Sequence, residues 1–176
     1  MPRPLGDDAD LAHWKRILEP TEQPANYWYR LTGEDGTLAG IAGLQEIDYV
    51  NGNAVLPVFL AEDARRQGLG TRVSALLLVL AFSYLRLTRV TSYFREDNGS
   101  SRKMTEGLGF EVEGRLRAGS YFQGKRYDTF VIGILEPEWS QARIALREQL
   151  DSDVRVYLGQ VSERTPSWPP PAGREM

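Results

Sequence analysis

The stretch Arg65-Arg66-Gln67-Gly68-Leu69-Gly70 connects an apolar run that ends at Leu60 to a predicted helix over residues 71–85. A glycine loop between a strand and a helix presents bare backbone N–H groups at the N-terminus of the helix. Such N–H groups bind phosphate without any special side chain. Two arginines precede the glycines and add charge-assisted donors. The stretch therefore predicts a binding site for a phosphorylated ligand.

Composition limits the classes of protein that fit this chain. The chain has 176 residues with a net charge of -3, so its overall charge does not favour nucleic acid or an acidic membrane surface. It has no cysteine and a single histidine, His13, so neither a thiolate nor a histidine-rich metal site is expected. The N-terminus does not resemble a signal peptide, and the apolar run over residues 75–82 is too short to span a bilayer. We therefore expect a soluble, cytoplasmic protein without a metal ion.

Hydrophobic periodicity predicts helices over residues 7–19, 71–85, 100–107 and 138–150. Apolar and β-branched runs predict strands over residues 27–31, 38–49, 54–60, 90–94, 110–117, 127–135 and 154–158. Pro57 cannot donate a ladder hydrogen bond, so we expect its strand to be bulged or unpaired there. A polar segment is expected to connect the strands over residues 110–117 and 127–135. The pattern predicts an α+β fold with a mixed, mostly antiparallel sheet.

Three kinds of phosphate-binding loop compete for the glycine stretch. A P-loop needs lysine and serine or threonine directly after its last glycine, but Thr71 and Arg72 follow Gly70 here. A dinucleotide-binding fingerprint needs three glycines, and this loop has two. The third pattern begins with arginine or glutamine, which is followed by any two residues, a glycine, any one residue and a small residue. Arg65-x-x-Gly68-x-Gly70 fits this pattern. A plain glycine turn before a helix is the alternative without a ligand.

The third pattern resembles the GCN5-related N-acetyltransferase (GNAT) superfamily. The segment from Asn98 through Ser101 to Gly109-Phe110 resembles the family's next motif and follows at the expected distance. Glu113-Gly114, Tyr127-Asp128 and residues 133–135 resemble its Rim-type branch of ribosomal-protein N-acetyltransferases. The resemblance covers about residues 1–139, so we expect a GNAT-like domain there and a C-terminal extension over residues 140–176.

The resemblance implies that acetyl-CoA or another acyl-CoA is the co-substrate. Its pyrophosphate would lie on the amides of residues 67–71, beside Arg65 and Arg66. Its pantetheine arm would pair with free backbone groups near Phe59 and Leu60 and with the amide of Asn98. The residues implied in binding are therefore Phe59, Leu60, Arg65, Arg66, Gln67, Gly68, Leu69, Gly70, Thr71, Asn98 and Ser101.

The resemblance also implies attack by an amine on a thioester, which needs an acid and a base. Many relatives place a tyrosine acid where this chain has Thr105, whereas Rim-type relatives can use a serine at the position of Ser101. We therefore predict Ser101 as the acid. Positions that often carry an acidic residue hold Val55 and Ser120 instead. As bases we considered water and the carboxylates of Glu46, Asp48 and Asp128, and Asp48 is favoured over Glu46.

The expected activity is acyl-CoA-dependent N-acyl transfer, most simply acetyl transfer, to an amine. The acceptor could be a peptide N-terminus or a small molecule, and the donor could instead be a carrier-protein thioester. A non-catalytic module that binds acyl-CoA is the alternative from another class. The extension could pair with a second subunit in a homodimer, and the basic cluster Arg115, Arg117, Lys125 and Arg126 could recognise an acidic acceptor or a carrier protein.

Overall fold

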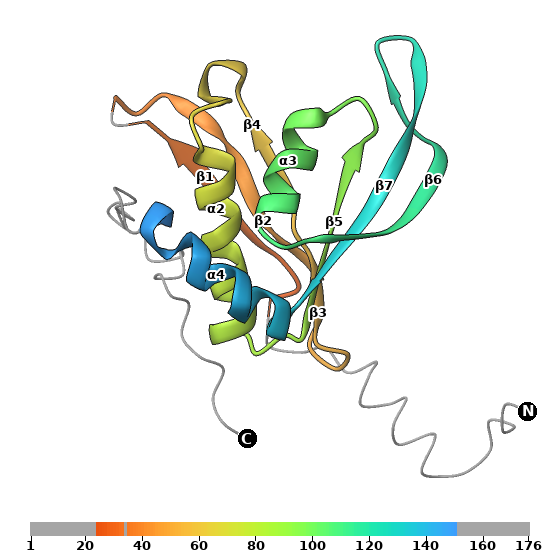
Figure 1. The fold of residues 1–176 in the computed structure, drawn as a ribbon. Helices are drawn as coiled ribbons and strands as arrows, with labels where there is room; N and C mark the ends of the chain where they lie inside the picture. Colours follow the sequence, from red (N-terminus) through yellow and green to blue (C-terminus); the bar gives the residue numbers. More distant parts are fainter. Residues whose placement is uncertain (1–23, 34, 151–176) are drawn as a thin grey trace, which may run out of the picture.

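The computed structural model describes residues 24–33 and 35–150, with side chains up to Leu146. Within these residues, seven strands form one sheet in the order β1-β2-β3-β5-β7-β6, with β4 paired to β2 (Figure 1). The pair β3–β5 is parallel and every other pair is antiparallel. The predicted α+β fold with a mostly antiparallel sheet is confirmed.

The strands are β1 (Tyr27–Thr32), β2 (Leu38–Asp48), β3 (Asn53–Val55), β4 (Val58–Leu60), β5 (Arg89–Arg95), β6 (Glu111–Phe122) and β7 (Lys125–Leu135). The helices are the 3₁₀ turn η1 (Glu62–Ala64), α2 (Leu69–Val79), α3 (Gly99–Gly107) and α4 (Glu136–Leu150). A π-helical turn, η2 (Leu80–Tyr84), continues α2 without a break. Within the described residues, every helix is too short or too polar to span a membrane.

Pro57 divides the strand predicted over residues 54–60 into two short strands. β3 ends at Val55 and pairs with β5, whereas β4 begins at Val58 and pairs with β2. The carbonyl of Pro57 still accepts a hydrogen bond from the N–H of Gly43, so only the proline's missing donor interrupts the ladder. The break predicted at Pro57 is therefore confirmed: β2 pairs with the chain on both sides of it, whereas β5 pairs only with β3.

The strands β6 and β7 extend further into the polar segment between them than the sequence indicated. Both strands run on into a long hairpin that projects from the sheet (Figure 1). Its two-residue turn is Gln123-Gly124, in which both residues have positive φ, as a type I′ turn requires. The prediction was wrong because both faces of this hairpin are largely exposed, so its sequence lacks the apolar alternation of a half-buried strand.

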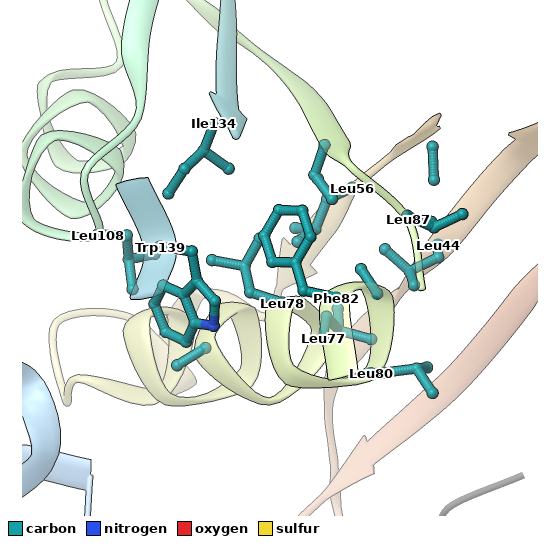
Figure 2. Close-up of a cluster of buried hydrophobic side chains, with 14 of the residues drawn as sticks. Leu44, Leu56, Leu77, Leu78, Leu80, Phe82, Leu87, Leu108, Ile134 and Trp139 are labelled. Carbon is teal, nitrogen blue, oxygen red and sulfur yellow. The ribbon is translucent and has the colours of Figure 1, made fainter. Parts of the chain in front are cut away.

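The hydrophobic core lies between the sheet and α2, η2 and α4 (Figure 2). Leu78, Leu80 and Ile134 are fully buried there, and Trp139 of α4 is only 1% exposed. Each such side chain stabilises the fold by about 1.5–3 kcal/mol through removal of its apolar surface from water. The boundary predicted at residue 139 falls inside α4, whose first turns belong to this core. The expected helix over residues 7–19, strand over residues 154–158 and proline-rich tail lie outside the described residues.

Candidate active site

The glycine loop forms the N-terminus of α2. Gly68 is the N-cap residue and has a φ of 74°, which is a left-handed conformation that suits glycine. No side chain caps the helix. The N–H groups of a helix's first turn have no partner within the helix, and here they also receive no side-chain acceptor. An anion at this position would satisfy these N–H groups and the positive end of the helix dipole.

Three side-chain hydrogen bonds hold the loop in place. The Nε of Arg65 donates to the carbonyl of Leu60 at 3.1 Å, which ties the loop to the end of β4. The Nε2 of Gln67 donates to the carbonyl of Asp63 at 2.8 Å, and Nη2 of Arg72 donates to the carbonyl of Gln67 at 3.0 Å. The predicted donors Arg65 and Gln67 therefore also shape the loop, while the remaining guanidinium donors of Arg65 have no other recorded acceptor.

A gap separates β4 from the second half of β5. The parallel β3–β5 pairing ends where the N–H of Leu56 donates to the carbonyl of Thr91. Beyond that point β4 pairs with β2, and β5 pairs with β7. In Figure 1 the two strands diverge on either side of α3. The backbone edges that face each other across the gap are left without strand partners among the described residues.

The register shows which groups on β4 face this gap. Pro57 accepts from Gly43 and Ala61 donates to Ala39, so these residues point their backbone groups toward β2. Backbone groups alternate in direction along a strand, so Phe59 also points toward β2, whereas Val58 and Leu60 point into the gap. Leu60 therefore offers a free N–H as the sequence implied, but its neighbour in the gap is Val58 instead of Phe59.

A cavity of about 250 Å³ fills this gap. Phe59 and Tyr93 reach it from the face of the sheet that points away from the helices. Ser74 of α2 and Met104 of α3 reach it from the opposite side. The cavity therefore passes through the sheet. None of the described residues that line the cavity carries a charge. These residues are Gln45, Val55, Leu56, Pro57, Val58, Phe59, Ser74, Ser92, Tyr93, Ser101, Met104, Thr105 and Phe110.

The N-terminus of α3 brings Ser101 to the cavity. Asn98 caps this helix, because its Oδ1 accepts a hydrogen bond from the N–H of Ser101 at 3.1 Å. The hydroxyl of Thr105 donates to the carbonyls of Ser101 and Arg102, both at 3.0 Å, so this hydroxyl is occupied within the helix. Ser101 itself is half-buried and has no recorded side-chain partner. Of the predicted residues, Phe59 and Ser101 meet at one cavity.

The three carboxylates considered as bases lie elsewhere. Asp48 closes the turn between β2 and β3, where its carboxylate accepts from the N–H of Asn51, the amide of Asn51 and the N–H of Val50. These hydrogen bonds hold the pKa of Asp48 below its usual range. The N–H of Ala118 and the guanidinium of Arg115 lower the pKa of Asp128 in the same way. Neither of these carboxylates lines the cavity, and nor does Glu46.

Sequence reasoning missed four polar residues that line the cavity, namely Gln45, Ser74, Ser92 and Tyr93. The hydroxyl of Ser92 donates to the carbonyl of Leu56 at 2.7 Å, next to the point where the ladder ends. Ser74 is 1% exposed, and its hydroxyl has no hydrogen-bond partner. A polar residue on the buried stripe of an apolar helix was the signal for Ser74 in the sequence.

The comparisons with known proteins agree with this architecture. A family model described as an acetyltransferase (GNAT) domain matches residues 1–111. The candidate ribosomal N-acetyltransferase YdaF of Bacillus subtilis is 33% identical over 105 residues, which are 60% of this chain and 57% of YdaF. The spermidine N(1)-acetyltransferase of Escherichia coli is 29% identical over 91 residues, which are 52% of this chain and 49% of that protein. The chain therefore matches only about half of the length of these relatives.

Solved structures show the same fold. Mutant forms of the spermidine/spermine N-acetyltransferase SpeG from Vibrio cholerae superpose with a TM-score of 0.62 at 20% identity, covering 76% of this chain and 78% of that one. This likeness concerns the fold alone. The family model covers more than half of the chain. The chain belongs to the GNAT acetyltransferase family.

Proposed function

We propose that the chain is an acyl-CoA-dependent N-acetyltransferase in which an amine attacks the thioester directly. The cavity that passes through the sheet carries this proposal, because it is lined from both faces. Two substrates that approach from opposite faces can meet inside it without a covalent enzyme intermediate. The names of the relatives YdaF and spermidine N(1)-acetyltransferase support the same class of reaction.

Three features of the chain fit acyl-CoA. The uncapped N-terminus of α2, next to Arg65 and Arg66, suits a pyrophosphate on the N–H groups of residues 67–71. The free backbone edge at Val58 and Leu60 suits the amides of a pantetheine arm, which would pair as an added strand does. The buried hydroxyl of Ser74 lacks a partner that such an arm could supply. Free CoA suits this loop better than a carrier protein does, because a carrier-bound arm has only one phosphate.

The hydroxyl of Ser101 is the group that we assign to the leaving thiolate. In the reaction the amine nitrogen forms a C–N bond to the acyl carbon, the C–S bond breaks, and the sulfur gains a proton. Ser101 lines the cavity, and the cap from Asn98 fixes the helical turn that carries it. Thr105 is unsuitable because its hydroxyl is already donated to two carbonyls.

Water is the proton acceptor in this proposal, and Asp48 has no part in the chemistry. Of the described cavity residues, none is ionisable at neutral pH, so none of them offers a carboxylate to hold an ammonium group or take its proton. In this proposal the acceptor therefore arrives as the free amine. An α-amine has a pKa of about 7.7–8.0, whereas a lysine-like amine has one of about 10.4. We therefore propose a peptide α-amine or a small-molecule amine of similar pKa as the acceptor, in preference to a polyamine.

The test uses the full chain with acetyl-CoA and follows free thiol release. The acceptors are a short peptide with a free N-terminus, the same peptide with a blocked N-terminus and one lysine, and spermidine. We expect the free N-terminus to give the highest kcat/KM. Fastest turnover with spermidine would overturn the proposed acceptor. Tight binding of acetyl-CoA with no acceleration by any amine would show a non-catalytic module instead of an enzyme.

Two matched variants test the role of Ser101. Ser101→Ala is expected to lower kcat by about 10²-fold, the lower end of a general acid's contribution, without changing the affinity for acetyl-CoA. Tyr93→Phe removes another cavity hydroxyl that has no hydrogen-bond partner among the described residues, and it is expected to keep more of the activity. A larger loss in Tyr93→Phe than in Ser101→Ala would transfer the role of acid to Tyr93.

A further inference from the structure

Ser74 lies on α2, one turn beyond the glycine loop, and is 1% exposed. Its hydroxyl has no hydrogen-bond partner, and the residue lines the cavity. A buried hydroxyl without a partner costs about 1–3 kcal/mol of stability, so most proteins pair such groups. The only other buried side-chain polar atom without a partner, within residues 24–33 and 35–146, is the indole nitrogen of Trp139.

Two of the neighbouring hydroxyls in the cavity wall already donate hydrogen bonds within the protein. Ser92 donates to the carbonyl of Leu56, and Thr105 donates to the carbonyls of Ser101 and Arg102. Neither can turn toward a ligand without losing a hydrogen bond. Ser74 would lose none by turning toward a ligand.

The position of Ser74 on α2 indicates which part of a ligand it meets. It follows Gly70 by four residues and lies on the same face of the helix, about 6 Å deeper along the axis. That face packs against Leu60 of β4 and Met104 of α3, since both approach the α-carbon of Gly70 closely. A molecule with its phosphates on the loop and its chain in the gap between β4 and β5 passes Ser74 before it reaches Ser101.

We propose that the hydroxyl of Ser74 donates a hydrogen bond to an amide carbonyl of the pantetheine arm of acyl-CoA. This inference rests on the proposed function, because it assumes that acyl-CoA occupies the cavity. The arm contains two amides, and their carbonyls are the acceptors that the buried hydroxyl lacks. Ser74 is thus a binding residue that orients the arm, and it takes no part in proton transfer.

The test compares the full chain with its Ser74→Ala variant by calorimetric titration of CoA, acetyl-CoA and 3′,5′-ADP. We expect the variant to bind CoA and acetyl-CoA about 2- to 13-fold more weakly, the value of one ordinary hydrogen bond. Binding of 3′,5′-ADP, which has no pantetheine arm, should not change. The melting temperature of the unliganded variant should equal or exceed that of the parent, because a buried unpaired hydroxyl has been removed. Ser83→Ala, at an exposed position of η2, is the matched control.

Two results would overturn the inference. Equal binding of all three ligands by parent and variant would show that Ser74 touches none of them. An equal loss for 3′,5′-ADP and CoA would show that the substitution acts through the phosphate loop and not on the arm. Failure of the parent chain to bind CoA or acetyl-CoA would contradict the proposed function itself, and the control variant would share that failure.

Discussion

Gly70 of α2 lies against Met104 of α3 so closely that a methyl group on Gly70 would be 2.8 Å from the Met104 sulfur. Met104 is flexible and borders the cavity, so it can yield only by moving toward that space. Gly70→Ala should therefore leave the free energy of unfolding within about 1 kcal/mol, since alanine also favours the helix. It should weaken CoA binding by about 1–3 kcal/mol, the usual cost of overpacking.

Titration calorimetry and urea unfolding of Gly70→Ala measure the two effects separately. The double variant Gly70→Ala with Met104→Ala is the control, because it removes the atom that the new methyl group meets. We expect the double variant to recover most of the lost affinity. Normal CoA binding by Gly70→Ala alone would contradict the placement of the ligand between α2 and α3.

Gly68 has open space around it but an unusual backbone. Its φ is 74°, and a β-carbon there would meet only Arg72 at 3.6 Å. Gly68→Ala should therefore cost about 1–2 kcal/mol through backbone strain, measured by urea unfolding. Gly68→Asn should cost less, because asparagine tolerates the left-handed conformation. Equal costs for both variants would show that space and not φ selects glycine here.

Asp48 is expected to matter for stability and not for turnover. The N–H groups of Asn51 and Val50 lower its pKa, so it stabilises the fold above the carboxyl's unfolded pKa of about 3.8. This stabilisation is lost as the pH falls through the lower folded pKa. Asp48→Ala should therefore reduce the melting temperature at pH 7 and flatten its fall below pH 4.

Acetyl transfer by Asp48→Ala at 25 °C should match that of the parent chain. Glu46→Ala is the matched control, because Glu46 is exposed on the same strand and no hydrogen bond to its carboxylate is recorded. A large loss of kcat in Asp48→Ala with an unchanged melting temperature would restore Asp48 as the base.

Trp139 joins α4 to the core. It is 1% exposed, and its indole nitrogen has no partner. Trp139→Ala should therefore cost about 3–5 kcal/mol in urea unfolding, whereas Trp139→Phe should cost less because no hydrogen bond is lost. Ile144→Ala on the same helix is the control, since Ile144 is 73% exposed and should change little. Little loss in Trp139→Ala would show that the packing of α4 on the core contributes little to stability.

The sequence alone was sufficient to predict the helices and strands that bury one face in the core. The helix after Gly70 was predicted within a few residues because its apolar stripe is continuous, and Pro57 revealed the broken ladder through its missing donor. The ends of β6 and β7 were missed because they are exposed on both faces, and so they carry no hydrophobic pattern.

The site was harder to predict because it depends on which ends of the elements meet. The loop and α3 could be found as contiguous motifs. Ser74 differs in this respect, since it belongs to no motif and the cavity around it is built by residues distant in the sequence. Only the folded structure shows that Ser74 lines the cavity between two strands that are not paired with each other.

The passage of the cavity through the sheet has a consequence for inhibition. A compound that joins a CoA-like chain to an amine would have to thread through the gap between β4 and β5, with one end on each face. Either substrate would compete with such a compound, but each occupies only one half of its site and would need a high concentration to displace it. Release would require the two strands to separate further, so residence time would depend on the sheet's own rigidity at Leu56, where the ladder ends.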